Sequence, residues 1–463
     1  TSLFGRQALV HRLRSGCAEP ARSMGARAAR EPATAAVLAA AASARRQLRC
    51  VRLDLVPALF DDALPVLPAW ADRLWLVPLL LAAGVLLALL HSPLLGALVL
   101  MAWALVSAIF VARLSTPLRR WREIRDGLTT LLAAGREMAA AARLAPRPWL
   151  TELVDAEAAL VAQWRRLAPN AMERLPALVE YLNLVALYDY ARMRRQLDAV
   201  RADLPDLRAS FERIASADAD LCLAGHLRDA LSWCLAGKGA ARQLSLQAMV
   251  HPLLAQAQPL SLQLDGQGLL ITGHNGVGKS TLLRAVGLNL LAARGLGFCY
   301  AAAATVPDLP VMSSIENRDN LQTADSLYMA ELRRSADLLK VSAAGAGAVF
   351  LVDELFRGTN HVESVSAAGA VLATLARRSL VLVSTHSVVL APLLRARLRP
   401  MCIVRGSPPA SLLLEDGVLV EPNGIDIMQD HDLPPGVITA AREIAAWLTA
   451  HDAGAQDPPE LAS

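Results

Sequence analysis

The second half of the chain alternates short, uninterrupted apolar runs with longer stretches whose apolar residues recur at helical spacing. Residues 269–272, 348–352 and 380–384 are the clearest of these runs. Uninterrupted apolar strands separated by amphipathic helices are typical of a mainly parallel sheet that helices cover on both faces. We therefore expect an α/β domain at residues 241–452 and a disordered tail at 453–463.

The first half of the chain is rich in alanine, leucine and arginine at helical spacing. Residues 1–73 and 113–240 both carry charges beside an apolar stripe, which indicates packed helices, partly of coiled-coil type in the second segment. The pattern predicts an all-α domain ahead of the α/β domain, with a boundary at residues 237–240.

Two uncharged apolar runs, 74–90 and 94–112, interrupt this helical half. Each is close to the ~20 residues that a helix needs to cross a bilayer. No lysine or arginine lies in the turn between them, whereas the second run is followed by Arg113, Arg119, Arg120, Arg122 and Arg125. The positive-inside rule then predicts a transmembrane helical hairpin at 74–112 in the inner membrane, with both ends and the α/β domain in the cytoplasm. The alternative is two buried helices of a large α-domain.

The run at 269–272 leads into a glycine-rich segment that fits G-x-x-x-x-G-K-[ST], the phosphate-binding loop. The segment is Gly273, His274, Asn275, Gly276, Val277, Gly278, Lys279 and Ser280, followed by Thr281. In this motif the backbone wraps an anion at a helix N-terminus, the lysine reaches the β- and γ-phosphates, and the hydroxyl ligates Mg²⁺. The alternative is a chance glycine-rich turn, but the chain has only three lysines and one of them occupies the motif position.

Two carboxylates follow the next apolar run, where Asp353 and Glu354 come directly after residues 348–352. With a phosphate loop upstream, we expect Asp353 to hold Mg²⁺, directly or through water, and Glu354 to orient and polarise the attacking water. The run at 380–384 leads to His386, which either senses the γ-phosphate or is a structural histidine at a strand end.

Composition narrows the possible partners of the chain. The 463 residues carry a formal net charge of only +4 and 4% aromatic residues, so the electrostatic and stacking case for nucleic-acid binding is weak. Hydrophobic residues reach 54%, which favours contact with a membrane. The six cysteines show no C-x-x-C spacing, which indicates free thiols in a reducing compartment rather than a disulfide framework or a metal site.

Several segments of the second half resemble the MutS family of mismatch-repair ATPases. Residues 353–360 match D-E-x-x-x-G-T-[NS], and residues 384–386 are similar to the family's A-T-H. The other similar segments, in the family's order, are 251–253, 325–332, 423–428 and 433–438. Ahead of these, residues 1–9 and 218–224 are similar to the opening of the family's helical core domain and to the close of its lever helices.

This resemblance implies an ATPase that binds and hydrolyses ATP with Mg²⁺ and works as a homodimer of facing ATPase domains, in which Ser326 reaches the partner's nucleotide. It also implies binding of mismatched or damaged DNA and a role in DNA mismatch repair. The apolar hairpin falls about where the family inserts its DNA clamp, and no F-x-E wedge motif is present. We therefore expect a membrane-anchored, MutS-like branch that lacks the mismatch-recognition domain.

Two features of the sequence keep another class of function open. The loop reads G-H-N-G-V-G-K-S, which is closer to transporter-type (ABC) ATPases than to the G-P-N-M-G-G-K-S usual in MutS proteins. Together with the hairpin, it favours an ABC-like membrane ATPase in transport or signalling that has no DNA role. The absence of an L-S-G-G-Q signature between the loop and the acidic strand opposes that alternative.

Overall fold

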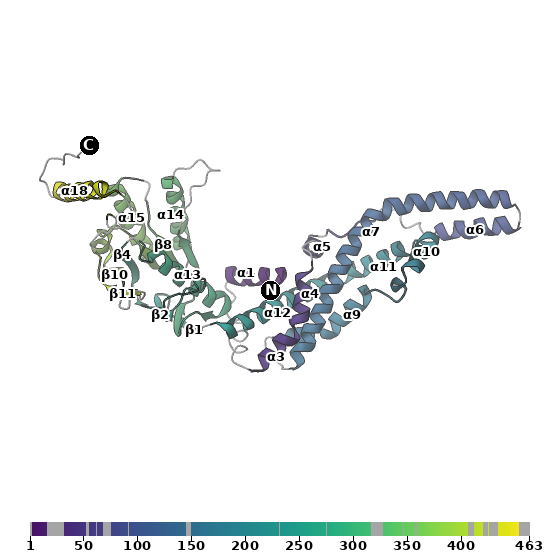
Figure 1. The fold of residues 1–463 in the computed structure, drawn as a ribbon, viewed down its shortest axis with the longest axis horizontal. Coiled ribbons are helices and arrows are strands. Elements are labelled where there is room, and N and C mark those ends of the chain that lie inside the picture. The colour runs from purple at the N-terminus through teal and green to yellow at the C-terminus, as the bar shows by residue number, and fades with distance from the viewer. Residues whose placement is uncertain are drawn as a thin grey trace. The chain divides into compact units, whose positions relative to one another are not determined.

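The chain divides into two units, whose main segments are Ser23–Asp229 and Ala230–Ser463. The computed structural model (Figure 1) describes residues 2–15, 32–51, 55–61, 63–67, 76–90, 92–144, 150–230, 232–274, 276–315, 327–345, 347–356, 359–405, 412–419, 425 and 434–452. The predicted tail at 453–463 lies outside these residues. The division comes before the expected boundary at 237–240, because β1 (Cys234–Gly239) already pairs with other strands of the second unit.

The described part of the first unit consists of helices and short connections, with no strands. Its elements are α1 (Leu3–Ser15), α3 (Pro32–Ala40), α4 (Ala42–Arg49), α5 (Leu55–Phe60), α6 (Leu76–Leu90), α7 (Pro93–Leu144), α8 (Thr151–Asp155), α9 (Glu157–Leu167), η3 (Met172–Arg174), α10 (Pro176–Ala186), α11 (Tyr188–Ala202) and α12 (Leu204–Asp229). The second half of α7 forms the centre of the core, with Trp121, Leu131 and Met138 buried among residues of the neighbouring helices. This apolar stripe is what the helical spacing of the sequence predicted.

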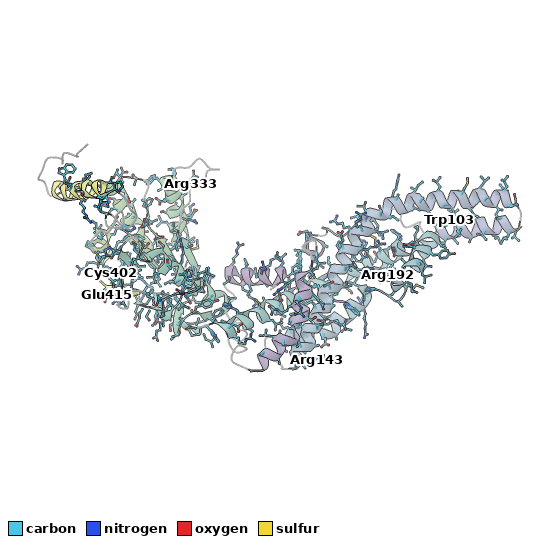
Figure 2. All side chains as sticks on the ribbon, in the orientation of Figure 1. Trp103, Arg143, Arg192, Arg333, Cys402 and Glu415 are labelled. Carbon is cyan, nitrogen blue, oxygen red and sulfur yellow. The ribbon has the colours of Figure 1, made fainter. Side chains whose placement is uncertain are left out.

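Helix α6 lies alongside the first part of α7, the part that carries Trp103 in Figure 2. The two helices meet through small residues. A Cβ atom built on Gly96 would lie 2.2 Å from the Cβ of Ala88, and one built on Gly84 would lie 3.2 Å from Leu100. Such close backbone approach is typical of helix pairs that associate by packing of small residues.

The two apolar runs of the sequence correspond to α6 and to the start of α7. Within the part of the chain that the structure describes, one helical segment, Pro93–Phe110, is long and apolar enough to cross a membrane, and 11% of it is buried. Leu76–Leu90 is a shorter apolar helix. Such a segment is weak support for a membrane span by itself. The expected boundary at residues 112 and 113 lies inside α7, which continues to Leu144 as one helix.

The second unit combines strands and helices. Its strands are β1 (Cys234–Gly239), β2 (Gln243–Met249), β3 (Leu260–Asp265), β4 (Gly268–Gly273), β5 (Phe298–Cys299), β6 (Ala303–Pro307), β7 (Val311–Ser314), β8 (Val349–Asp353), β9 (Leu380–Ser384), β10 (Leu398–Arg405) and β11 (Leu412–Asp416). Its helices are α13 (Lys279–Leu296), α14 (Leu327–Ala344), α15 (His361–Leu375), α16 (Leu390–Leu394) and α18 (Pro435–Asp452).

The larger sheet has the strand order β11-β10-β4-β9-β8-β7, and only β11 runs antiparallel to its neighbour. Alternate residues of its strands enter two separate cores. Leu269 and Ile271 pack with residues of α13, whereas Leu270 packs with residues of α15 and α16 on the other face. Helices therefore cover both faces, which is why these strands are uninterrupted apolar runs in the sequence.

A smaller mixed sheet, β3-β2-β6-β1-β5, was not predicted from the sequence. Strands β2 and β3 alternate apolar and polar residues, a period-2 signal of half-buried strands that the sequence analysis did not use. Strand β5 contains only two residues, too few for a periodic signal.

Candidate functional site

The glycine-rich segment connects β4 to α13 at the carboxyl edge of the larger sheet. Gly276 and Gly278 have φ angles of +73° and +107°, and Gly278 is the N-cap residue of α13. Residues with a side chain rarely adopt these angles, so the turn needs glycine at both positions. The loop therefore directs the unpaired N–H groups of the first turn of α13 outward, where the helix dipole favours an anion.

The side chain of Lys279 lies inside the curve of this loop. Its Nζ donates hydrogen bonds to the carbonyl oxygens of Gly273 at 2.8 Å and His274 at 3.0 Å, and the residue is buried. Burial lowers the pKa of Lys279, and the carboxylates of Glu354 and Asp353 oppose that effect. The ammonium group thus lies within electrostatic range of both carboxylates that the sequence singled out.

The strand register brings the acidic pair to the same edge of the sheet. Strand β9 lies between β4 and β8, with Ser384 opposite Ile271 on one side and opposite Asp353 on the other. Because the three strands are parallel, their carboxyl ends meet there. Asp353 is buried, and its Oδ1 accepts a short hydrogen bond from the Oγ of Ser384. Ser384 thus positions the carboxylate, a role that the sequence pattern did not reveal.

Glu354 lies within hydrogen-bonding distance of His386, with Nε2 of the imidazole and Oε1 of the carboxylate 2.6 Å apart. Its backbone φ is +47°, an unusual value for a residue with a side chain, and its N–H donates to the Ser384 carbonyl at 3.1 Å. Non-glycine residues in this conformation have to be held by their surroundings and occur preferentially at functional sites. Glu354 and His386, to which the sequence analysis gave separate roles, are therefore direct neighbours in the site.

Thr272 is another contributor that the sequence analysis missed. Its buried Oγ1 accepts a hydrogen bond from the N–H of Leu419 at 3.0 Å, which ties the strand before the loop to the segment after β11. A threonine at the end of an apolar strand gave no sequence signal for this contact. Asn275 and Ser326 of the predicted set lie outside the described residues.

The residues at this edge fit a magnesium–phosphate group. Ser280 and Asp353 offer oxygen atoms, and Mg²⁺ prefers one or two protein oxygens completed by water and phosphate oxygens. Among the described residues no group of three or more His, Cys, Asp and Glu side chains could hold a metal ion.

A helix N-terminus with a glycine loop at the carboxyl edge of a parallel sheet, facing two carboxylates, defines the class of α/β nucleotide-binding domains. Residues 269–449 match the family described as MutS domain V. This match and the relatives below support the MutS family for the second unit of the chain.

The similar proteins are mostly mismatch-repair proteins by name. The chain is 30% identical to the DNA mismatch repair protein MutS of Thermus aquaticus over 224 residues, which are 46% of this chain and 27% of the relative. It is 29% identical to that of Chlorobaculum tepidum over 299 residues, 59% of this chain and 34% of the relative. It is 31% identical to endonuclease MutS2 of Anaeromyxobacter over 237 residues, 47% of this chain and 29% of the relative. The chain thus spans about a third or less of the relatives' length.

Proposed function

We propose that the second unit binds ATP with Mg²⁺ and hydrolyses it at the carboxyl edge of the larger sheet. The observation that carries the proposal is the convergence of Lys279, Asp353 and the Glu354–His386 pair beside the N-terminus of α13. These side chains come from segments far apart in the sequence, so their meeting is a property of the fold.

The residues divide the chemistry among them. The N–H groups of residues 273–281 and the ammonium of Lys279 bind the phosphate oxygens, and Lys279 exchanges its two loop carbonyls for them. Ser280 and Asp353 hold the Mg²⁺, which neutralises charge on the phosphate oxygens when bound. Glu354 accepts a hydrogen bond from the attacking water and takes up its proton.

His386 positions the catalytic carboxylate in this proposal. Its contact with Oε1 of Glu354 fixes the orientation of that side chain, and its place at the end of β9 lets it respond to the γ-phosphate. The unit works as a homodimer through its ATPase domain, with Ser326 contacting the partner's nucleotide. Both of these features rest on the resemblance to the MutS family.

The test compares two variants with matched controls in the full chain. Lys279→Ala should weaken ATP binding at least about tenfold, because the site loses its charge-assisted contact with phosphate. Glu354→Gln should still bind ATP, while turnover falls about a hundredfold or more. The controls are Lys340→Ala, an exposed lysine paired with Asp337, and Glu415→Gln on β11, and both should retain binding and turnover. Unchanged hydrolysis in Lys279→Ala and Glu354→Gln would refute the proposal.

We further propose that α6 and the start of α7 anchor the chain in the inner membrane, with the ATPase domain in the cytoplasm. The uncharged helix Pro93–Phe110 and the exposed leucines of the hairpin support this. Carbonate washing of membranes tests it, because an inserted hairpin stays with the lipid whereas a peripheral protein is released.

We also consider mismatched or damaged DNA as a ligand, because the similar proteins are named DNA mismatch repair proteins. The net charge of +4 gives it little electrostatic support. A titration of homoduplex and mismatched duplex at two salt concentrations separates the outcomes. Binding that prefers the mismatch supports a repair role, and no binding at either concentration leaves the ABC-like alternative, a membrane ATPase of transport or signalling.

A further inference from the structure

A cavity of about 290 Å³ lies in the first unit, where α7 leaves its apolar segment. One wall is α7, with Leu114, Ser115, Leu118, Arg119 and Arg122, and the other is the junction of α10 and α11, with Asn183, Leu187, Asp189 and Tyr190. The cavity therefore combines apolar walls with two guanidinium groups. It is far along the chain from the nucleotide site and takes no part in the proposed hydrolysis.

The α10–α11 junction has a strained but well-fixed backbone. Leu187 has a φ of +49°, is buried, and packs with Val77, Leu114 and Tyr190. Asn183 holds the junction by exchanging two hydrogen bonds with Asp189, one to its carboxylate at 2.9 Å and one from its N–H at 2.8 Å. A left-handed non-glycine residue persists only where its surroundings determine it, so this wall of the cavity is preorganised.

The two guanidinium groups differ in their pairing. Arg122 forms an ion pair with Asp189, so its charge already has a partner within the protein. Arg119 lines the same cavity, is exposed, and makes no ion pair with any residue that the structure describes. The cavity thus retains one unbalanced positive charge beside an apolar wall, which suits an anion that is attached to an apolar body.

The position along α7 matches the headgroup layer of a bilayer. The apolar segment ends at Phe110, and Ser115 and Arg119 follow about 8 Å and 14 Å further along the helix axis at 1.5 Å per residue. Side chains on a helix lean toward its N-terminus, so the Arg119 guanidinium leans back toward the apolar segment. Long basic side chains at span ends reach the lipid headgroups in this way.

We propose that this cavity binds the phosphodiester headgroup of an anionic phospholipid, with Arg119 as the principal phosphate ligand and Leu118 against the upper acyl chains. The proposal rests on the membrane anchoring proposed above and is independent of ATP hydrolysis. It gives the hairpin a lipid preference in addition to a means of insertion.

The test uses the full chain in zwitterionic detergent and counts retained lipids by native mass spectrometry during titration with phosphatidylglycerol or phosphatidylcholine. Arg119→Gln should weaken phosphatidylglycerol retention about tenfold, because a charge-assisted contact to phosphate is lost. Ser115→Phe should weaken it as well by filling the cavity without changing its charge. The matched control is Arg113→Gln, which removes an equal charge from α7 outside the cavity and should have a small effect.

The outcomes distinguish a bound lipid from a soluble phosphate ligand. They also distinguish failure of this proposal from failure of the membrane and ATPase proposals. Equal effects of Arg119→Gln and Arg113→Gln, with none of Ser115→Phe, would mean diffuse attraction and overturn the pocket. Displacement of the lipid by glycerol phosphate or inorganic phosphate at comparable concentration would mean a soluble ligand and also overturn it. Release of the wild-type chain by carbonate would show that the hairpin is not inserted in the membrane, and this result would also overturn the lipid proposal. ATP turnover of Arg119→Gln, measured in parallel, should equal that of the wild type whatever the lipid result.

Discussion

At the scale of single residues, the candidate site depends on side chains that their neighbours hold in place. Lys279 is buried against two carbonyl oxygens, and Glu354 is held in a left-handed conformation beside His386. Each of these side chains has an energetic cost that only its neighbours offset. Substituting one of these side chains therefore tests whether its contacts with the neighbouring residues are present.

Lys279 should make stability depend on pH in alkaline solution. Burial lowers its pKa in the folded state below the usual 10.5, so the folded chain releases this proton at a lower pH than the unfolded chain. Where the unfolded state binds more protons, stability rises with pH. The free energy of unfolding of the wild type minus that of Lys279→Met should therefore increase as pH rises from the lowered pKa toward 10.5. Urea titrations measure it, and the control is Lys340→Met, which removes an exposed amine and keeps Lys279.

His386 should affect turnover more than nucleotide binding. Removing its imidazole in His386→Ala leaves Glu354 without its positioning partner, so kcat should fall about tenfold with little change in KM. The control is His361→Ala at the exposed start of α15. Steady-state kinetics of both variants decide the point, and an equal loss in both would argue against the positioning role.

At the scale of elements, close packing of helices rests on residues without room for a side chain. In the hairpin Gly96 meets Ala88, and near the N-terminus Gly5 meets the carboxylate of Asp218, which lies 2.3 Å from a Cβ built on the glycine. Asp218 in α12 also accepts hydrogen bonds from Ser2 and forms an ion pair with Arg45 of α4. These contacts fix how the helices are arranged.

Gly96→Ala should destabilise the hairpin, although alanine is the better helix former. The added methyl group would overlap Ala88, and overpacking costs about 1–3 kcal/mol. Gly127→Ala on the same helix is the matched control, because its methyl group meets only ordinary contacts at 3.7 Å and 3.8 Å. That variant should be stabilised by about 0.5–1 kcal/mol. Thermal unfolding in detergent distinguishes them, and a loss of the same size in both variants would contradict the packing.

Asp218→Asn should destabilise the first unit by about 3 kcal/mol, because the ion pair with Arg45 loses its buried partner. Asp229→Asn at the exposed end of α12 should have almost no effect. Denaturant unfolding followed by circular dichroism measures both variants. A similar small change in both would show that Asp218 does not hold α1 and α4 to α12.

At the scale of the whole molecule, each unit has cores of its own. The clusters around Trp121 and Tyr190 contain only residues up to Leu221, and the two cores of the larger sheet contain only residues from Cys234 onward. Among the described residues, none of these four clusters mixes residues of the two units. Separate cores are the usual mark of segments that can fold alone.

A fragment of residues 230–463 should therefore fold by itself and bind ATP with an affinity within about threefold of the full chain, a difference of less than 1 kcal/mol. The same fragment with Lys279→Ala should fold equally well and fail to bind, which separates folding from the site. Circular dichroism and a fluorescent-nucleotide titration measure the two properties. An unfolded fragment would show that the second unit needs the first.

Much of the candidate site could be predicted because its signals are local. The strands at 268–273, 349–353 and 380–384 are recognisable as buried apolar runs because both of their faces are covered, and the loop motif is contiguous from Gly273 to Ser280. The two helices of the hairpin could be predicted for the same reason, because each is a contiguous apolar run without charge. Whether its helices lie in a membrane is decided by their surroundings rather than by their own residues.

The sequence by itself determined the helical character of the first half, three strands of the larger sheet, the position of the loop, and the main side chains that can carry the chemistry. Only the tertiary structure decided that β9 lies between β4 and β8, that Glu354 pairs with His386, and that Ser384 holds Asp353. The smaller sheet and the cavity beside Arg119 likewise became apparent only from the tertiary structure. The physical reason is that hydrophobic period and turn chemistry act over a few neighbouring residues, whereas strand order and side-chain pairing result from the packing of distant segments against one another.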